Sequence, residues 1–277
     1  MFKLLNYLSG YFYLFRPYSW INLLLLATIA IQFAVSELFA IGLVLALILW
    51  FLLILILEYV HKDEGRPNIH IILPIALLAT AGFLVFNNLS ALTALFSLTI
   101  VSFLYALKKK AYFGLISFIV RGLQQVLLFL TIFFFAGGIT ESIPILFVIF
   151  VFSFAAARNL IADFRDVVVD KVTLPIIAGM PFSKIVAGIL LMFSSYLSFA
   201  LLPHLALLVP IILLFLLLIL YNPVKLHRSA IILTTAYFST YLALLTNNPW
   251  WLVLIGADAL SSMLFYKKIS RPANIQL

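Results

Sequence analysis

The sequence lacks cysteine and is poor in charge. None of its 277 residues is Cys, and only 9% are Asp, Glu, Lys or Arg, while 66% are hydrophobic. The absence of Cys excludes disulfide bonds and thiolate chemistry. A soluble domain carries about a quarter charged residues, so this chain has too little polar surface to cover a globule in water. Most of its surface must therefore face lipid.

The apolar segments also lack the alternation of barrel strands. They are continuous and roughly 20 residues long, which is the length that a helix needs to cross hydrocarbon. We therefore predict an all-α polytopic bundle of nine to ten spanning helices that forms one domain over residues 1–277. Hydropathy places ten spans at about 20–36, 38–57, 70–86, 89–107, 113–136, 143–162, 183–202, 205–221, 229–246 and 249–266.

Lys and Arg are missing from one set of the connections between these spans. The formal net charge is +8, which in a soluble protein would suggest nucleic acid, but here we interpret it as a topological signal. Basic loops stay in the cytoplasm, so we expect an integral cell-membrane protein with both termini cytoplasmic and no nucleic-acid partner. Arg121 and Arg158 fall well inside predicted spans, both toward the basic end, and Lys184 is the second residue of another.

Acidic residues are scarce, and three of the nine lie in one short segment. Asp163, Asp166 and Asp170 follow each other at i, i+3 and i+7, so a continuing helix places them on one face, with Asn159 one turn earlier. Mg²⁺ prefers such oxygen ligands and bridges carboxylates to substrate phosphates. The alternative is a solvated helix end, but ionisable residues at the edge of a membrane span are usually functional.

Two further segments on the same face carry groups that suit a phosphate or metal site. Lysines bind phosphate as point charges, although a basic flank after a span is also common. The residues concerned are Tyr105, Lys108 and Lys109 in the first segment, and Glu58, Asp63 and Arg66 in the second. The sequence of the second segment is equally typical of a loop without a function.

These landmarks together resemble the UbiA superfamily of intramembrane prenyltransferases, and especially its archaeal branch that makes digeranylgeranylglyceryl phosphate. The second aspartate motif of that family is matched by the three aspartates and the following Thr-Leu-Pro. Weaker matches are the opening Arg-Pro, the Tyr and Lys after the fourth span, and a Gly that begins the fifth. The matching positions are Arg16-Pro17, Tyr105, Lys108, Lys109, Gly114, Asp163, Asp166, Asp170 and Thr173-Leu174-Pro175.

The resemblance implies an enzyme that moves an isoprenyl group from an isoprenyl diphosphate to a lipid or aromatic acceptor with Mg²⁺. It implies metal ligation by Asp163, Asp166 and Asp170, with Glu58 and Asp63 as replacements in the first motif. It also implies diphosphate binding by Lys108, Lys109 and Arg66 and a catalytic role for Tyr105.

The first motif departs from the family pattern, because its Asn-Asp pair is missing and only Arg66-Pro67 is clear. A catalytically impaired relative that binds a prenyl lipid or scaffolds a membrane partner is therefore the alternative. A transporter is less favoured, because the polar residues gather at one interface rather than at the midplane. The sequence leaves the oligomeric state, the acceptor and the chain length of the prenyl group open.

Overall fold

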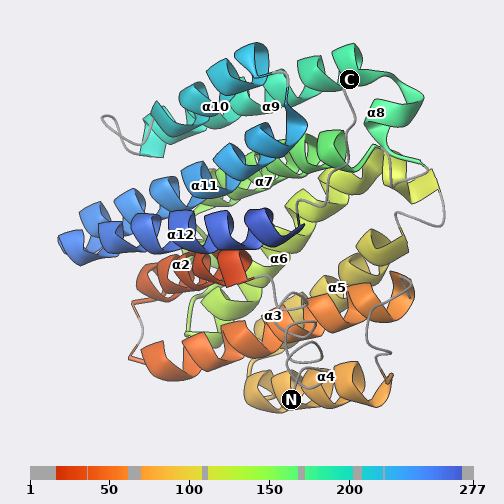
Figure 1. Cartoon of the computed structure of the whole chain (residues 1–277). Coiled ribbons are helices and arrows are strands. Elements are labelled where there is room, and N and C mark those ends of the chain that lie inside the picture. The colour runs from red at the N-terminus through yellow and green to blue at the C-terminus, as the bar shows by residue number, and fades with distance from the viewer. Residues whose placement is uncertain are drawn as a thin grey trace, which may run out of the picture.

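The protein is described by a computed structural model over residues 17–35, 37–61, 70–107, 112–167, 172–201, 208–220 and 222–269. Within these ranges the chain forms helices joined by short connections (Figure 1). The helices are α2 (Pro17–Phe33), α3 (Phe39–His61), α4 (Ile72–Val85), α5 (Leu89–Ala106), η2 (Tyr112–Ile116), α6 (Ser117–Phe135), η3 (Thr140–Ser142), α7 (Ile145–Asp166), α8 (Leu174–Ile177), α9 (Met180–Leu201), α10 (Leu208–Ile219), α11 (Pro223–Thr246), η4 (Pro249–Leu252) and α12 (Val253–Ile269).

Each of the ten spans predicted from hydropathy coincides with one of the longer helices, which confirms the all-helical bundle. Among the described residues, six helical stretches are long and apolar enough to cross a membrane: Phe39–Val60, Leu89–Ala106, Gly114–Phe135, Ile145–Asp166, Met180–Leu201 and Pro223–Thr246. The protein is thus a polytopic membrane protein. Three more apolar helices are shorter, so the count of nine or ten spans stays a prediction.

Helices α6 and α7 form the centre of the bundle. They pack closely on each other, with α5 against α6, and α9 and α11 against α7; α2 contacts α3, α6, α11 and α12 (Figure 1). Gly122 of α6 permits the close approach, because a Cβ there would lie 2.8 Å from the Phe152 carbonyl oxygen. In lipid there is no hydrophobic driving force between helices, so helices associate largely through van der Waals packing. Small residues favour this packing because they let the backbones approach closely.

An aromatic cluster fills the interior between α6, α7 and α11. Phe129, Phe147, Phe150 and Tyr237 are fully buried, and the Phe150 and Tyr237 rings stack with centroids 4.3 Å apart. Offset aromatic pairs at such distances add to the packing energy of the buried surface. This cluster packs α7 against α11, and so positions the polar side chains of both helices.

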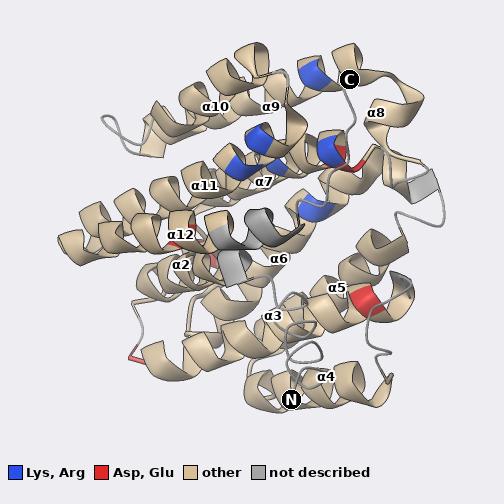
Figure 2. Ribbon diagram, in the orientation of Figure 1, with Lys and Arg blue, Asp and Glu red and all other residues tan. Residues whose placement is uncertain are grey.

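The basic side chains gather toward one end of the long helices (Figure 2). Arg121 lies near the start of α6, Arg158 and Arg165 near the end of α7, and Lys184 and Lys225 near the starts of α9 and α11. Since consecutive long helices run in opposite directions, these positions share one end of the bundle. The charge asymmetry expected from the sequence is therefore a property of the folded structure.

Candidate functional site

The site begins with Asp163, which is fully buried near the end of α7. Its Oδ2 accepts a hydrogen bond of 2.8 Å from the Ser117 hydroxyl at the start of α6. The Asn159 side-chain amide, one turn earlier on α7, donates a longer bond of 3.5 Å to the same oxygen. A buried carboxylate needs such donors, because an unpartnered one pays a large desolvation penalty. The two donors therefore hold this carboxylate in one orientation.

Tyr105 extends this cluster from the end of α5. Its hydroxyl donates a hydrogen bond of 2.8 Å to Asn159 Oδ1. The face of its ring lies against the Arg121 guanidinium, whose Cζ is 5.4 Å from the ring centroid, a distance at which a cation is attracted by an aromatic ring. Tyr105, Asn159, Ser117 and Asp163 thus form one connected group, called here the α5–α7 polar cluster.

Asp166 lies one turn beyond Asp163 and is held by its neighbour in sequence. The Arg165 guanidinium donates bonds of 2.6 Å and 2.7 Å to the two oxygens of Asp166, a bidentate geometry that is among the stronger ionic contacts. Another nitrogen of Arg165 lies 3.1 Å from His227 Nδ1 on α11. The long side chain of Arg165 thus links the end of α7 to both Asp166 and α11.

The remaining predicted site residues are only partly placed. Asp63, Arg66, Lys108, Lys109 and Asp170 lie outside the described residues. Glu58 is buried near the end of α3, which packs chiefly against α2, α4 and α5. In the part of the chain that the structure describes, no three Asp, Glu or His side chains come together as a metal site. The metal ligation by these residues therefore stays a prediction.

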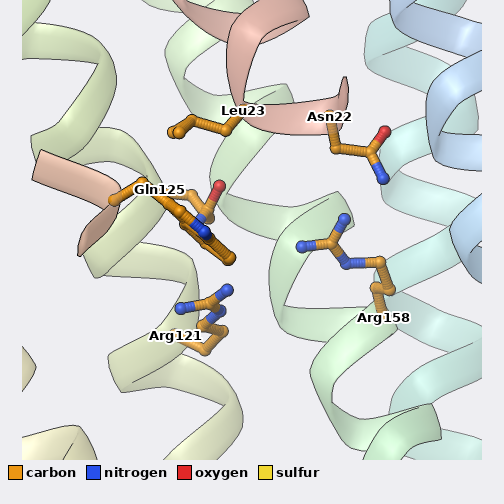
Figure 3. A pocket seen from close by; sticks show the side chains of 6 residues that line it. Asn22, Leu23, Arg121, Gln125 and Arg158 are labelled. Carbon is orange, nitrogen blue, oxygen red and sulfur yellow. The ribbon is translucent and has the colours of Figure 1, made fainter. Parts of the chain in front are cut away.

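A pocket next to the α5–α7 polar cluster is lined by residues that the sequence analysis did not assign (Figure 3). The lining comprises Asn22, Leu23, Trp50, Arg121, Gln125 and Arg158. Arg121 also donates a hydrogen bond to Gln124 Oε1, and the Gln124 amide donates one of 2.9 Å to the Ser102 hydroxyl of α5. Polar contacts between α5 and α6 thus hold Arg121 in place.

On the other side of the pocket, Asn22 belongs to a second buried group with Thr235 of α11 and Asp258 of α12. The Thr235 hydroxyl lies 2.8 Å from Asn22 Oδ1 and 2.5 Å from Asp258 Oδ2. Asp258 is fully buried, and its Oδ1 has no hydrogen-bond partner within the described ranges. Asp258 and Arg158 are close enough for their charges to interact.

Comparison with solved structures decides the fold. A UbiA homologue from Archaeoglobus fulgidus bound to Cd²⁺ superposes with a TM-score of 0.56, covering 93% of this chain and 97% of that chain at 17% identity. The chain has a UbiA-like fold. The same homologue bound to GPP and Mg²⁺ gives a TM-score of 0.54 at 16% identity, covering 94% of this chain and 99% of that chain. Bound to DMAPP and Mg²⁺, it gives a TM-score of 0.54 at 17% identity, covering 92% of this chain and 99% of that chain.

No protein-family model matches the sequence, and no curated protein matches it either. The likeness therefore lies in the arrangement of the helices. The structure brings Tyr105 and Asp163, which the sequence analysis named, together with Ser117, and it places Asn22 and Thr235 in the second group; the sequence analysis named none of these last three. Single hydroxyl and amide groups inside apolar spans are the signal that could have pointed to them, because polar groups in lipid are costly and usually have partners.

Proposed function

We propose that this protein is an integral-membrane prenyltransferase, which moves an isoprenyl group from an isoprenyl diphosphate to a lipid or aromatic acceptor. The observation that carries the proposal is the α5–α7 polar cluster, because it brings two independently predicted residues, Tyr105 and Asp163, into one hydrogen-bonded group. The UbiA-like fold supports it, since the solved homologue of that fold binds GPP or DMAPP together with Mg²⁺.

The residues at the end of α7 fit a hard divalent cation. Asp163 and Asp166 offer carboxylate oxygens at one end of the bundle, where Mg²⁺ would be held together with the phosphate oxygens of a substrate. When bound, such a metal neutralises the charge of the leaving diphosphate. The two bonds from Arg165 leave Asp166 with further lone pairs for a metal, and they would keep the guanidinium beside the phosphate oxygens.

The reaction proposed is a substitution at C1 of the isoprenyl group. The bond between C1 and the diphosphate oxygen breaks, and its electron pair leaves with the diphosphate. The acceptor forms a new bond to C1 and releases a proton to water. Ser117 and Asn159 keep the Asp163 carboxylate fixed throughout, and Tyr105 keeps Asn159 in place, so the protein supplies preorganised electrostatics rather than a covalent intermediate.

The test is consumption of geranylgeranyl diphosphate by the purified protein in detergent, with lipid and aromatic acceptors and with or without Mg²⁺. We expect Mg²⁺-dependent prenylated product, reduced at least 100-fold in Asp166→Ala. Lys225→Gln serves as the control, because Lys225 is exposed at the start of α11. Full activity of Asp166→Ala would contradict the assignment.

The missing Asn-Asp pair of the first motif supports a second candidate, a relative that binds a prenyl diphosphate without turning it over. In that case the same preparation would bind the diphosphate, Asp166→Ala would lose binding, and no product would form with any acceptor. Equilibrium binding of labelled geranylgeranyl diphosphate distinguishes the two candidates.

A further inference from the structure

The contact between Arg165 and Asp166 at the end of α7 joins two residues that are neighbours in sequence. Side chains at positions i and i+1 of a helix point about 100° apart around its axis, so they do not face each other. Helix geometry alone therefore does not account for the two bonds, 2.6 Å and 2.7 Å long, from this guanidinium to both carboxylate oxygens. A contact from outside the helix is needed to favour the arginine rotamer that makes them.

Solvent exposure also limits what this ion pair contributes by itself. The side chains of Arg165 and Asp166 are 28% and 26% exposed. Ion pairs that water reaches contribute little to stability, because holding two flexible side chains in one geometry costs entropy. A restraint on the arginine from another helix lowers this cost, since the guanidinium is then already placed when the carboxylate binds it.

His227 of α11 supplies a restraint of this kind. Its Nδ1 lies 3.1 Å from Arg165 Nη1, and the residue is buried. A guanidinium only donates hydrogen bonds, so Nδ1 of the imidazole is the acceptor. The two bonds to Asp166 involve Nε and Nη2 of the same guanidinium. All three of its nitrogens are thus engaged, two by α7 and one by α11.

The imidazole is carried by a well-anchored part of α11. The Asn222 side chain caps the start of this helix by accepting hydrogen bonds from its first backbone N–H groups, so His227 lies in the second turn of a capped helix. Further along, the stacked rings of Phe150 and Tyr237 pack α11 against α7. The position from which His227 contacts Arg165 is therefore set by the packing of two long helices.

We propose that His227 is a positioning residue, which fixes the Arg165 guanidinium and, through it, the orientation of the Asp166 carboxylate. The inference rests on the proposed function, in which Asp166 and Arg165 bind the metal and the diphosphate of the donor. Groups that hold metal ligands in place matter nearly as much as the ligands, and their loss commonly costs about 10- to 100-fold in affinity or activity. His227 would act on the donor only through Arg165.

The first experiment tests the contact in the ligand-free protein. Thermal unfolding of the full chain in detergent is measured for the wild type, His227→Leu, Arg165→Gln and the double variant. We expect each single substitution to lower the unfolding temperature. Arg165→Gln should lower it no more than half as much in the His227→Leu protein, because its partner is already gone. Losses that simply add would overturn the inference.

The second experiment measures the donor. Equilibrium binding of labelled geranylgeranyl diphosphate with Mg²⁺, and the donor KM and kcat of prenyl transfer, are compared for His227→Leu and His227→Asn. Asn carries Oδ1 as many bonds from the backbone as His carries Nδ1, so it can accept the same hydrogen bond. We expect His227→Leu to weaken donor binding and raise the donor KM about tenfold, with a smaller change in kcat. His227→Asn should stay within about threefold of the wild type.

A merely structural role of His227 predicts a different pattern. Both variants would then lower the unfolding temperature and leave the donor KM unchanged, which would overturn the inference. His70→Leu, the same substitution at an exposed histidine, is the control and should change neither quantity. If His227→Leu does not fold, Arg165→Lys replaces it with the same expected loss, because Lys keeps the charge but lacks the planar fork.

The two experiments separate this inference from the proposed function. The unfolding measurements need no ligand, so they decide whether His227 fixes Arg165 even if no donor binds. Coupled unfolding in a wild-type protein that binds no geranylgeranyl diphosphate would count against the proposed function alone. Additive unfolding in a protein that does bind it would count against the role of His227 alone.

Discussion

At the scale of single residues, the hydrogen bond from Ser117 to the Asp163 carboxylate, at 2.8 Å, is shorter than the one from Asn159, at 3.5 Å. Replacing Ser117 by Ala leaves a fully buried carboxylate with one donor fewer. Hydrogen bonds to charged groups contribute about 1.5–3 kcal/mol, so we expect a loss of stability of this size and a fall in prenyl transfer of at least tenfold. Thermal unfolding and turnover measure both effects, with the exposed Ser90→Ala on α5 as control. Unchanged turnover in Ser117→Ala would show that the orientation of the carboxylate does not matter.

Tyr105 has two separable contacts, and two substitutions tell them apart. Tyr105→Phe loses the hydroxyl that donates to Asn159 but keeps the ring beside Arg121. Tyr105→Leu loses both. We expect Tyr105→Phe to lower kcat several-fold, and Tyr105→Leu to lower it further, because the Arg121 guanidinium also loses the ring beside it. Identical kinetic constants for the two variants would mean that the ring contact with Arg121 contributes nothing.

The hydroxyl of Thr235 lies between two oxygen atoms but has only one hydrogen to donate. A hydroxyl carries one hydrogen, so Thr235 donates at any moment to only one of the two oxygens, Asn22 Oδ1 or Asp258 Oδ2. Thr235→Val removes this link and leaves two buried polar groups without it. We expect a destabilisation of about 1–3 kcal/mol, measured by thermal unfolding in detergent. Thr246, near the end of α11, serves as a comparison on the same helix. Its hydroxyl donates to the Leu242 carbonyl and accepts from the Trp251 indole nitrogen, both outside this group. Thr246→Val should therefore lose less stability than Thr235→Val.

The sequence predicted local neighbours on one helix, but not the contacts between distant helices. Asp163 and Asn159 are one helical turn apart, so their shared face followed from periodicity alone. Ser117 and Tyr105 lie far from them in sequence, and only the packing of α5 and α6 against α7 brings them together. Asp258 was visible as one of nine acidic residues, but its partner Asn22 is separated from it by nearly the whole chain. Sequence patterns over a few residues cannot predict a contact between residues so far apart in the chain.

At the scale of the elements, hydropathy located the helices well but not their interruptions. The short helix α8 and the 3₁₀ turns η2 and η4 do not follow from apolar length, because their residues are as hydrophobic as the neighbouring spans. The predicted continuation of α7 through the acidic segment is confirmed as far as Asp166, and Asp170 lies outside the described residues. Long helices follow from the demands of lipid on the backbone, whereas turns depend on tertiary contacts.

The contact between α6 and α7 gives a prediction about packing. In Gly122→Ala the new methyl group would meet the Phe152 carbonyl oxygen, a backbone atom that cannot rotate away. We expect a destabilisation of about 1–3 kcal/mol, as for other overpacked positions. Gly82→Ala on α4 is the matched control, because a methyl group at that position would meet nothing within 4 Å, and Ala has the higher helix propensity. A Gly122→Ala protein as stable as Gly82→Ala would mean that the helices separate freely.

At the scale of the whole molecule, the lack of cysteine makes the orientation in the membrane directly testable. Single cysteines at Glu141 and Asn248 would mark one end of the bundle, and one at Lys225 would mark the basic end; all three positions are exposed. Since basic segments stay in the cytoplasm, a membrane-impermeant maleimide should label the first two in intact cells and Lys225→Cys only after permeabilisation. The reverse pattern would contradict the cytoplasmic placement of the proposed active site.

The link between Asn22, Thr235 and Asp258 also has a consequence for how the protein assembles during its synthesis. Helix α2 is synthesised before α11, and α11 before α12, which carries Asp258. A carboxyl group among apolar residues makes a helix costly to place in lipid by itself. We therefore expect α12 to be stable in the membrane only once α2 and α11 are in place. Of these three helices, α12 is thus expected to pack last. A chain that stalls before it would leave Asn22 and Thr235 facing lipid, a defect that cellular quality control can recognise.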